Sequence, residues 1–70
     1  MDIHQMQEFA SLIARSNAAL IKAIGMQADN KVQECKNEYP NWYMHDFERI
    51  LHEYRLTIKD IDESLFKIAN

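Results

Sequence analysis

The hydrophobic residues in the second half of the chain follow a heptad pattern, alternating at steps of four and three residues. The members of this stripe are Phe47, Leu51, Tyr54, Ile58, Ile61, Leu65 and Ile68. Such spacing places the side chains along one side of an α-helix and is typical of a surface that packs against another helix. It predicts one long, coiled-coil-like helix over residues 42–68. Pro40 marks the boundary before it, because proline lacks a backbone donor and disfavours helix at the preceding residue.

A second stripe with the same spacing occupies the N-terminal third. Asp2 and Gln5 have the spacing of a capping box, which predicts a helix that starts at about residue 3. Asn17 falls inside the stripe, either as the single buried Asn that fixes register in some coiled coils or as a residue on a partly hydrated edge. The stripe consists of Ile3, Met6, Ala10, Ile13, Asn17, Leu20 and Ile24.

The heptad pattern fails after Ile24, where Gly25 stands, and a stripe of shifted phase follows it. The new stripe consists of Ala28, Val32, Cys35 and Tyr39. We favour a break or kink near residues 25–30, which divides this part into a helix over 3–24 and a second helical segment over 30–38. The alternative is one helix that tolerates the glycine and runs to about Glu38.

Thr57 presents a similar choice, because Thr57 and Asp60 have the spacing of an N-cap and its acidic partner. If a helix starts there, residues 56–69 resemble the second helix of a helix-turn-helix, which makes a small DNA-binding regulator the alternative function. We favour the continuous helix, because the heptad crosses Thr57 in phase. The segment is also acidic between Asp60 and Glu63, which opposes DNA binding.

The length of 70 residues predicts a single helical domain over 1–70 that is too small to bury a sizeable core alone. Small chains gain stability from disulfides, metals or a second subunit, and the single cysteine excludes an internal disulfide. The expected fold is therefore all-α, a helical hairpin or three-helix arrangement with the long helix at its C-terminal end. Its core is expected to be completed by oligomerisation.

Composition and charge argue against several classes of function. The net charge of −3, with scattered basic residues, predicts no binding to nucleic acid, and no apolar run is long enough to span a membrane. No nucleophile with its base is present, so we expect no enzyme and no cofactor, in a cytoplasmic protein. His45, Glu48 and His52 share one flank of a helix, but they extend over too long a distance to hold one metal ion.

Two residues near the predicted helix junction have alternative interpretations. Cys35 has lysines nearby, yet its apolar stripe favours a small buried hydrophobic residue over a reactive thiol. Trp42, close to Tyr39 and Tyr43, is interpreted as a residue that fills the corner between helices, with an interface anchor as the alternative.

Two short segments carry a resemblance to known proteins. Residues 25–30 (GMQADN), followed after a polar gap by residues 43–47 (YMHDF), resemble a stretch of small uncharacterised helical proteins encoded in phages and prophages. The chain departs from them in residues 31–33 (KVQ), where basic residues are usual, and in residues 40–42 (PNW), which replace a glycine-bearing loop. The resemblance implies an origin and no activity.

Together these patterns predict a non-enzymatic protein–protein interaction module, an adaptor, chaperone or inhibitor that acts through apolar helix faces. We expect a homo-oligomer, a dimer or larger, and a second protein of unknown identity as partner. The predicted interface residues are Ile13, Asn17, Leu20, Ile24, Trp42, Phe47, Leu51, Tyr54, Ile58, Ile61, Leu65 and Ile68.

Overall fold

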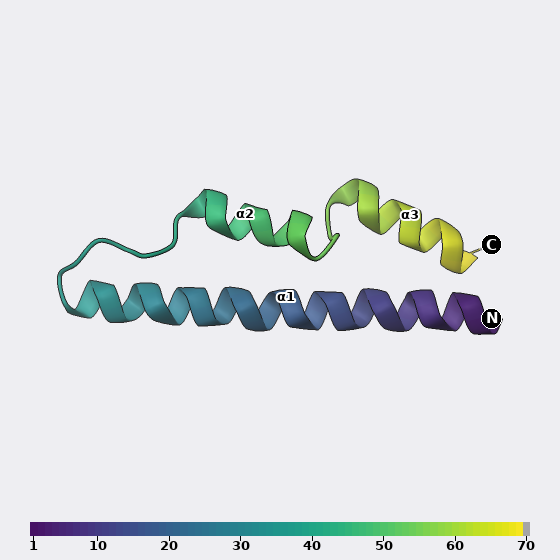
Figure 1. The fold of residues 1–70 in the computed structure, drawn as a ribbon, viewed down its shortest axis with the longest axis horizontal. Helices are drawn as coiled ribbons and strands as arrows, with labels where there is room; N and C mark the ends of the chain where they lie inside the picture. The colour runs from purple at the N-terminus through teal and green to yellow at the C-terminus, as the bar shows by residue number, and fades with distance from the viewer. Residues whose placement is uncertain (70) are drawn as a thin grey trace.

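A computed structural model describes residues 1–69 as three α-helices in a hairpin (Figure 1). Helix α1 (Ile3–Cys35) forms one leg, while α2 (Met44–Glu53) and α3 (Ile58–Ala69) follow each other along the second leg. Both α2 and α3 contact α1, and the start of α1 and the end of α3 lie at the same end of the hairpin. The Cα atoms extend over 52 × 18 × 12 Å, so the hairpin is a single layer of helices. The expected all-α fold is confirmed.

Helix α1 begins at the capping box that the sequence predicts. The Gln5 backbone N–H donates to the Asp2 carboxylate, and the Asp2 N–H donates to the Gln5 side chain, both at 2.8 Å. At the other end Asn37 adopts the left-handed conformation, with φ 57°. The Glu38 N–H then donates to the Gln33 carbonyl oxygen at 2.9 Å, which closes a Schellman turn and ends the helix.

The break expected near residues 25–30 is absent, because α1 continues through Gly25 to Cys35. Residues 30–35, expected in a separate helix, therefore belong to α1. Interior glycine costs a helix about 1 kcal/mol relative to alanine, which the packing on either side offsets. Ala19 and Met26 are both buried on the face that meets the second leg. The phase shift after Ile24 therefore changes which residues of α1 are exposed to solvent. It does not interrupt the face of α1 that packs against the second leg.

The single long helix predicted over residues 42–68 is also wrong, because a turn at residues 54–57 separates α2 from α3. Arg55 is left-handed, with φ 55°, and the Leu56 N–H donates to the Leu51 carbonyl oxygen at 2.6 Å in a second Schellman turn. Leu56 packs against the core, and Thr57 caps α3. These local contacts outweigh the continuity of the heptad.

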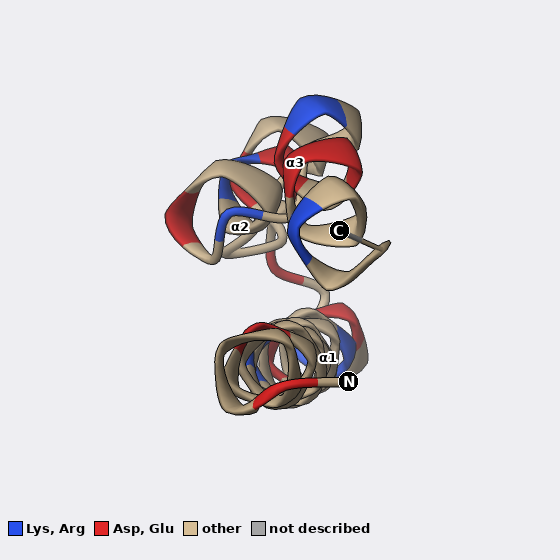
Figure 2. Cartoon of the chain, turned by 90° about the vertical axis from the view of Figure 1, so that its right-hand side faces the viewer, with Lys and Arg blue, Asp and Glu red and all other residues tan. Residues whose placement is uncertain are grey.

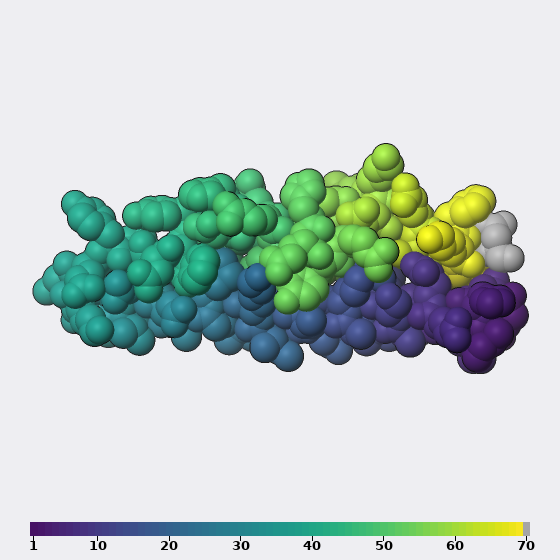
Figure 3. Space-filling model, viewed as in Figure 1, coloured from purple at the N-terminus to yellow at the C-terminus, as the bar shows by residue number. Residues whose placement is uncertain are grey.

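Only a small core lies between the legs. Among the described residues, the buried apolar side chains are Ala19, Met26 and Ile50, each less than a tenth exposed. Partly buried apolar residues surround them, namely Ala23, Trp42, Phe47, Tyr54 and Leu56. The space-filling view shows the legs in contact along most of their length, with the end of α2 (green) reaching down onto α1 (Figure 3). The two legs contact each other along a line that we call the seam, where Ala19 and Met26 of α1 and Ile50 and Ser64 of the second leg are buried. Within residues 1–69 no second layer of helices lies over the hairpin.

Candidate interaction surface

Four charged residues of α1 before residue 31 recur every seven residues and contact the second leg. Each of the four makes a contact there. Ser64 Oγ donates to Glu8 at 2.8 Å, Arg15 Nε to the Tyr54 carbonyl at 3.0 Å, Lys22 Nζ to Glu53 at 2.7 Å, and Trp42 Nε1 to Asp29 at 3.2 Å. These are all the Asp, Glu, Lys and Arg residues between positions 3 and 30. Up to residue 30, helix α1 therefore uses its charges for contacts with the second leg.

Arg15 joins three parts of the hairpin. Its Nε donates to the carbonyl oxygen of Tyr54 at the end of α2, and one terminal nitrogen donates to Ser64 Oγ of α3 at 3.2 Å. The other terminal nitrogen donates to Ser11 Oγ, one turn earlier in α1, at 2.6 Å. A planar guanidinium suits this role because its donors have a fixed geometry. Arg15 thereby fixes the turn between α2 and α3 against α1.

Lys22 and Glu53 form the ion pair between α1 and the end of α2, with both side chains substantially exposed. The hydrogen bond to Glu53 raises the pKa of Lys22 above its usual value, and the negative charge of Glu53 adds to this effect. The ammonium group also lies 5.9 Å from the centre of the Tyr54 ring, within the range of a cation–π contact. Lys22 therefore remains protonated throughout the physiological pH range.

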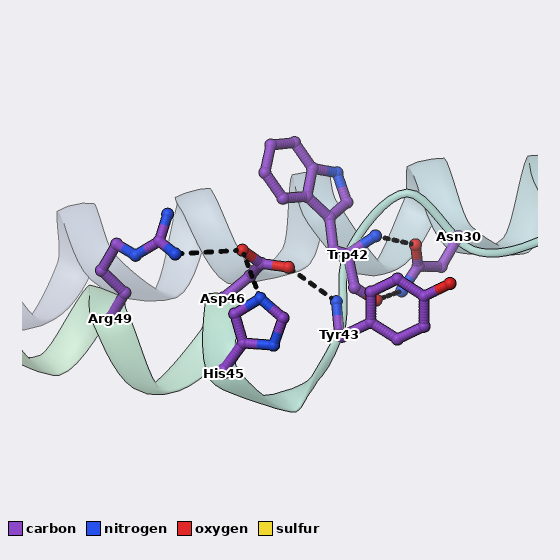
Figure 4. Close-up of polar contacts among 6 residues, drawn as sticks. All are labelled: Asn30, Trp42, Tyr43, His45, Asp46 and Arg49. Carbon is purple, nitrogen blue, oxygen red and sulfur yellow. Dashed lines mark hydrogen bonds and ion pairs between the residues drawn. The ribbon is translucent and has the colours of Figure 1, made fainter.

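Asn30 holds the loop between the legs by two hydrogen bonds (Figure 4). Its amide nitrogen donates to the Trp42 carbonyl oxygen at 2.8 Å, while the Trp42 N–H donates to the Asn30 side-chain oxygen at 2.9 Å. The Trp42 ring packs against the core. This pair of bonds positions the start of α2 relative to α1.

A cluster of polar side chains lies at the first turn of α2 in the same view (Figure 4). Asp46 accepts a hydrogen bond from the Tyr43 N–H at 2.9 Å and lies 3.5 Å from His45 Nε2 and 3.6 Å from Arg49. The Tyr43 and His45 rings stack at 6.2 Å between centroids. A carboxylate at this position also favours the helix, because the N-terminal end of a helix carries partial positive charge.

Thr57 and Asp60 cap α3 reciprocally. The Thr57 hydroxyl donates to the Asp60 carboxylate at 2.7 Å, and the Asp60 N–H donates to the Thr57 hydroxyl oxygen at 3.2 Å. The hydrogen bond from Thr57 lowers the pKa of Asp60 below its usual value. Asp60 therefore stabilises the start of α3 in its ionised form.

Large apolar side chains from both legs lie on one side of the seam. Successive residues of an α-helix are rotated by about 100° around its axis, and the two legs run antiparallel to each other. The residue that follows a seam residue therefore points to the same side from both legs. Three buried seam residues are each followed by an exposed leucine: Ala19 by Leu20, Ile50 by Leu51, and Ser64 by Leu65. A shallow groove lined by Gln27, which follows Met26, together with Met44 agrees with this geometry.

We call this surface the apolar face. The exposed fraction of its members ranges from 46% to 82%. Along each helix they alternate with residues that face the other leg. They are Met6, Phe9, Ile13, Leu20 and Ile24 from α1, and Met44, Leu51, Ile58 and Leu65 from the second leg. Large apolar side chains exposed along one side of a chain are typical of an interaction site.

The other side of the seam is polar. Residues that precede seam residues point there, among them Lys22, Arg49, Glu53 and Glu63. Viewed from the end that carries both termini, charged positions mark α2 and α3, whereas much of the α1 ribbon is uncharged (Figure 2). The two broad sides of the hairpin therefore differ in charge, although Ile21 and Phe66 are also exposed outside the apolar face, at 71% and 69%.

The predicted interface residues separate into two groups. Seven of them are exposed, namely Ile13, Asn17, Leu20, Ile24, Leu51, Ile58 and Leu65, and five are partly buried against the other leg, namely Trp42, Phe47, Tyr54, Ile61 and Ile68. Asn17 lies on the side of α1 turned away from the second leg. Sequence reasoning missed Arg15 and Asn30 as internal contacts, although the seven-residue recurrence of charge in α1 was a usable signal.

Other candidate positions carry little chemistry. Cys35 is exposed at the end of α1, so its prediction as a small buried residue is wrong, because the second leg ends short of covering it. His45, Glu48 and His52 are exposed on α2. Within residues 1–69 no group of three or more His, Cys, Asp and Glu side chains has a geometry for holding a metal ion. None of the described helices combines the length and apolar character needed to cross a bilayer.

Comparisons with known proteins returned no matching family model, no matching curated protein and no matching solved structure.

Proposed function

We propose that this chain is a non-enzymatic protein–protein interaction module that binds through its apolar face. The observation that carries the proposal is the placement of nine large apolar side chains, from both legs, on one exposed side of the hairpin. Burying a large apolar side chain completely contributes about 1.5–3 kcal/mol. Covering the face therefore supplies enough free energy for specific binding without any chemistry.

The arrangement of charge supports the same proposal. Between residues 3 and 28 the only charged side chains of α1 are Glu8, Arg15 and Lys22, and each is held by the second leg. A partner that covers the apolar face therefore does not have to remove these charges from water. Desolvation of charge is the main cost that apolar interfaces avoid.

A photo-crosslinking amino acid tests this function directly. Placed at Leu20, on the apolar face, it should form covalent adducts with protein in cells that express the chain. Placed at Ala14, which is exposed and rotated by about 100° around α1 from Ile13, it should form few. Adducts at neither position, or equal yields at both, would contradict the proposal.

The helix-turn-helix alternative gains one observation, the turn that starts α3 at Thr57. Its charge still opposes it, because α3 carries Asp60, Asp62 and Glu63 against Lys59 and Lys67. A DNA-binding helix needs basic groups toward the phosphates. We expect no salt-dependent binding of duplex DNA in a fluorescence anisotropy titration. Binding in the micromolar range would move this alternative to first place.

A further inference from the structure

We propose that the partner on the apolar face is a second copy of this chain, so that two hairpins stack face to face in a bundle of two layers. This inference rests on the proposed function, since it names the protein that the apolar face binds. It is carried by the thickness of the hairpin, the dimensions of the face and the distribution of charge around it.

The thickness of the hairpin shows what is missing. Folded domains enclose a core between at least two layers of secondary structure, whereas the Cα atoms of this chain extend only 12 Å along the shortest axis. The buried apolar residues of the described chain are correspondingly limited to Ala19, Met26 and Ile50. A second layer would enclose the exposed apolar side chains in a core, and a second copy of the chain is always available to provide it.

The dimensions of the face match a stable dimer. One broad side of the hairpin is limited by the Cα extents of 52 by 18 Å of the whole chain, so a face that covers most of that side is comparable with the roughly 800 Å² that each partner contributes to a standard interface. A two-fold dimer brings identical surfaces together, so the face must not repel itself. Among the charged residues that border it, Lys31 and Glu34 pair with each other at 3.3 Å. The shallow groove that Ile58 lines holds two lysines and two carboxylates, so neither place carries a net charge.

The charge of the hairpin also argues against a lipid surface as the partner of the apolar face. Helices that lie on membranes carry Lys and Arg along the polar side that meets the headgroups. Here the polar side of the second leg carries Glu53 and Glu63 beside Arg49, and the chain has a net charge of −3. An acidic hairpin is repelled by anionic membranes and has no such difficulty with a second apolar face.

Two adjacent positions of α1 provide a matched test, since Ile13 lies on the apolar face and Ala14 is exposed and rotated by about 100° around α1 from it. In sedimentation equilibrium the wild-type chain should be a dimer at micromolar concentration. Ile13→Glu should weaken dimerisation by about 1,000-fold, because a loss of at least about 30-fold for a central interface residue counts twice in a symmetric dimer. Ala14→Glu should dimerise like the wild type.

The melting temperature of the wild type gives a second measurement that does not depend on the variants folding. It should rise with protein concentration, because dissociation accompanies unfolding. A wild-type monomer whose melting is independent of concentration would overturn the inference. If that monomer co-sediments with phosphatidylcholine and phosphatidylglycerol vesicles, lipid covers the face instead. If it forms crosslinks only with other proteins at Leu20, the proposed function survives and the second copy is excluded.

Discussion

Replacing Arg15 by methionine should destabilise the hairpin more than any other single removal of charge from α1. The guanidinium connects α1 with the end of α2 and with Ser64 of α3 by two hydrogen bonds of 3.0 and 3.2 Å, and a third bond of 2.6 Å to Ser11 holds it within α1. Methionine retains a similar apolar stem but cannot donate. The carbonyl oxygen of Tyr54, which a continuous helix would have satisfied, then loses its protein partner.

The expected loss follows from these contacts. Hydrogen bonds that involve a charged group contribute about 1.5–3 kcal/mol each. The bond to Tyr54 is lost from a partly buried site, whereas Ser64 keeps its bond to Glu8 and Ser11 can turn to water. We therefore expect a total of about 2–3 kcal/mol. The whole chain is stabilised by only roughly 3–10 kcal/mol at this length, so the change lowers the melting temperature by about 10–20 °C.

Thermal and urea unfolding followed by circular dichroism at one fixed protein concentration measure this loss. Lys31→Met is the matched control, since it removes a positive charge from α1 where the side chain is 72% exposed. Exposed ion pairs contribute at most about 1 kcal/mol, so the control should melt near the wild type. Equal melting of Arg15→Met and Lys31→Met would refute the role assigned to Arg15.

Further variants test single elements of the fold, each by melting at fixed concentration. Gly25→Ala should stabilise the chain by about 1 kcal/mol, because an added Cβ meets nothing within 4 Å and alanine favours helix; a decrease in stability would indicate a hinge. Asp60 stabilises α3 above its usual pKa of 3.8, and this contribution is lost as the pH falls through its lowered pKa. Asp60→Asn should therefore reduce the loss of stability between about pH 5 and 2, and an unchanged pH profile would contradict the cap. Trp42→Ala should cost about 3–5 kcal/mol if the ring fills the corner, whereas wild-type melting would identify it as an interface anchor.

The sequence predicted those features that depend on neighbouring residues. Asp2 and Gln5 determine where α1 starts, because a capping box requires only the right residues at three-residue spacing. The alternation of apolar residues determined the helical class in the same way. Such signals are local, so they survive without knowledge of the tertiary structure.

The two errors in helix boundaries arose where local and tertiary effects compete. Gly25 suggested a break, yet Met26 is buried against the second leg and holds the helix together. At Thr57 the heptad suggested continuity, yet the turn places Leu56 on the core and the Tyr54 carbonyl on Arg15. In both places the packing between the legs decided the outcome, and neither contact is visible in the periodicity.

The surface itself was predicted only in part. The heptad stripes identified the exposed residues Ile13, Leu20, Leu51 and Leu65, but they did not reveal that on α1 the contact with the second leg uses other residues. Because that seam is made largely of polar and small side chains of α1, the strongest apolar pattern remains outside it. Periodicity shows that a face is apolar and cannot by itself say which face the chain covers internally.

Small-angle X-ray scattering of the full chain at micromolar concentration tests the central claim, that a second copy covers the apolar face, most directly. Two hairpins stacked face to face should give twice the chain mass of 8.3 kDa, in a particle whose length remains close to the 52 Å of one hairpin. A particle of single-chain mass with a radius of gyration near 15.8 Å would contradict the account, as would a dimer of twice the length.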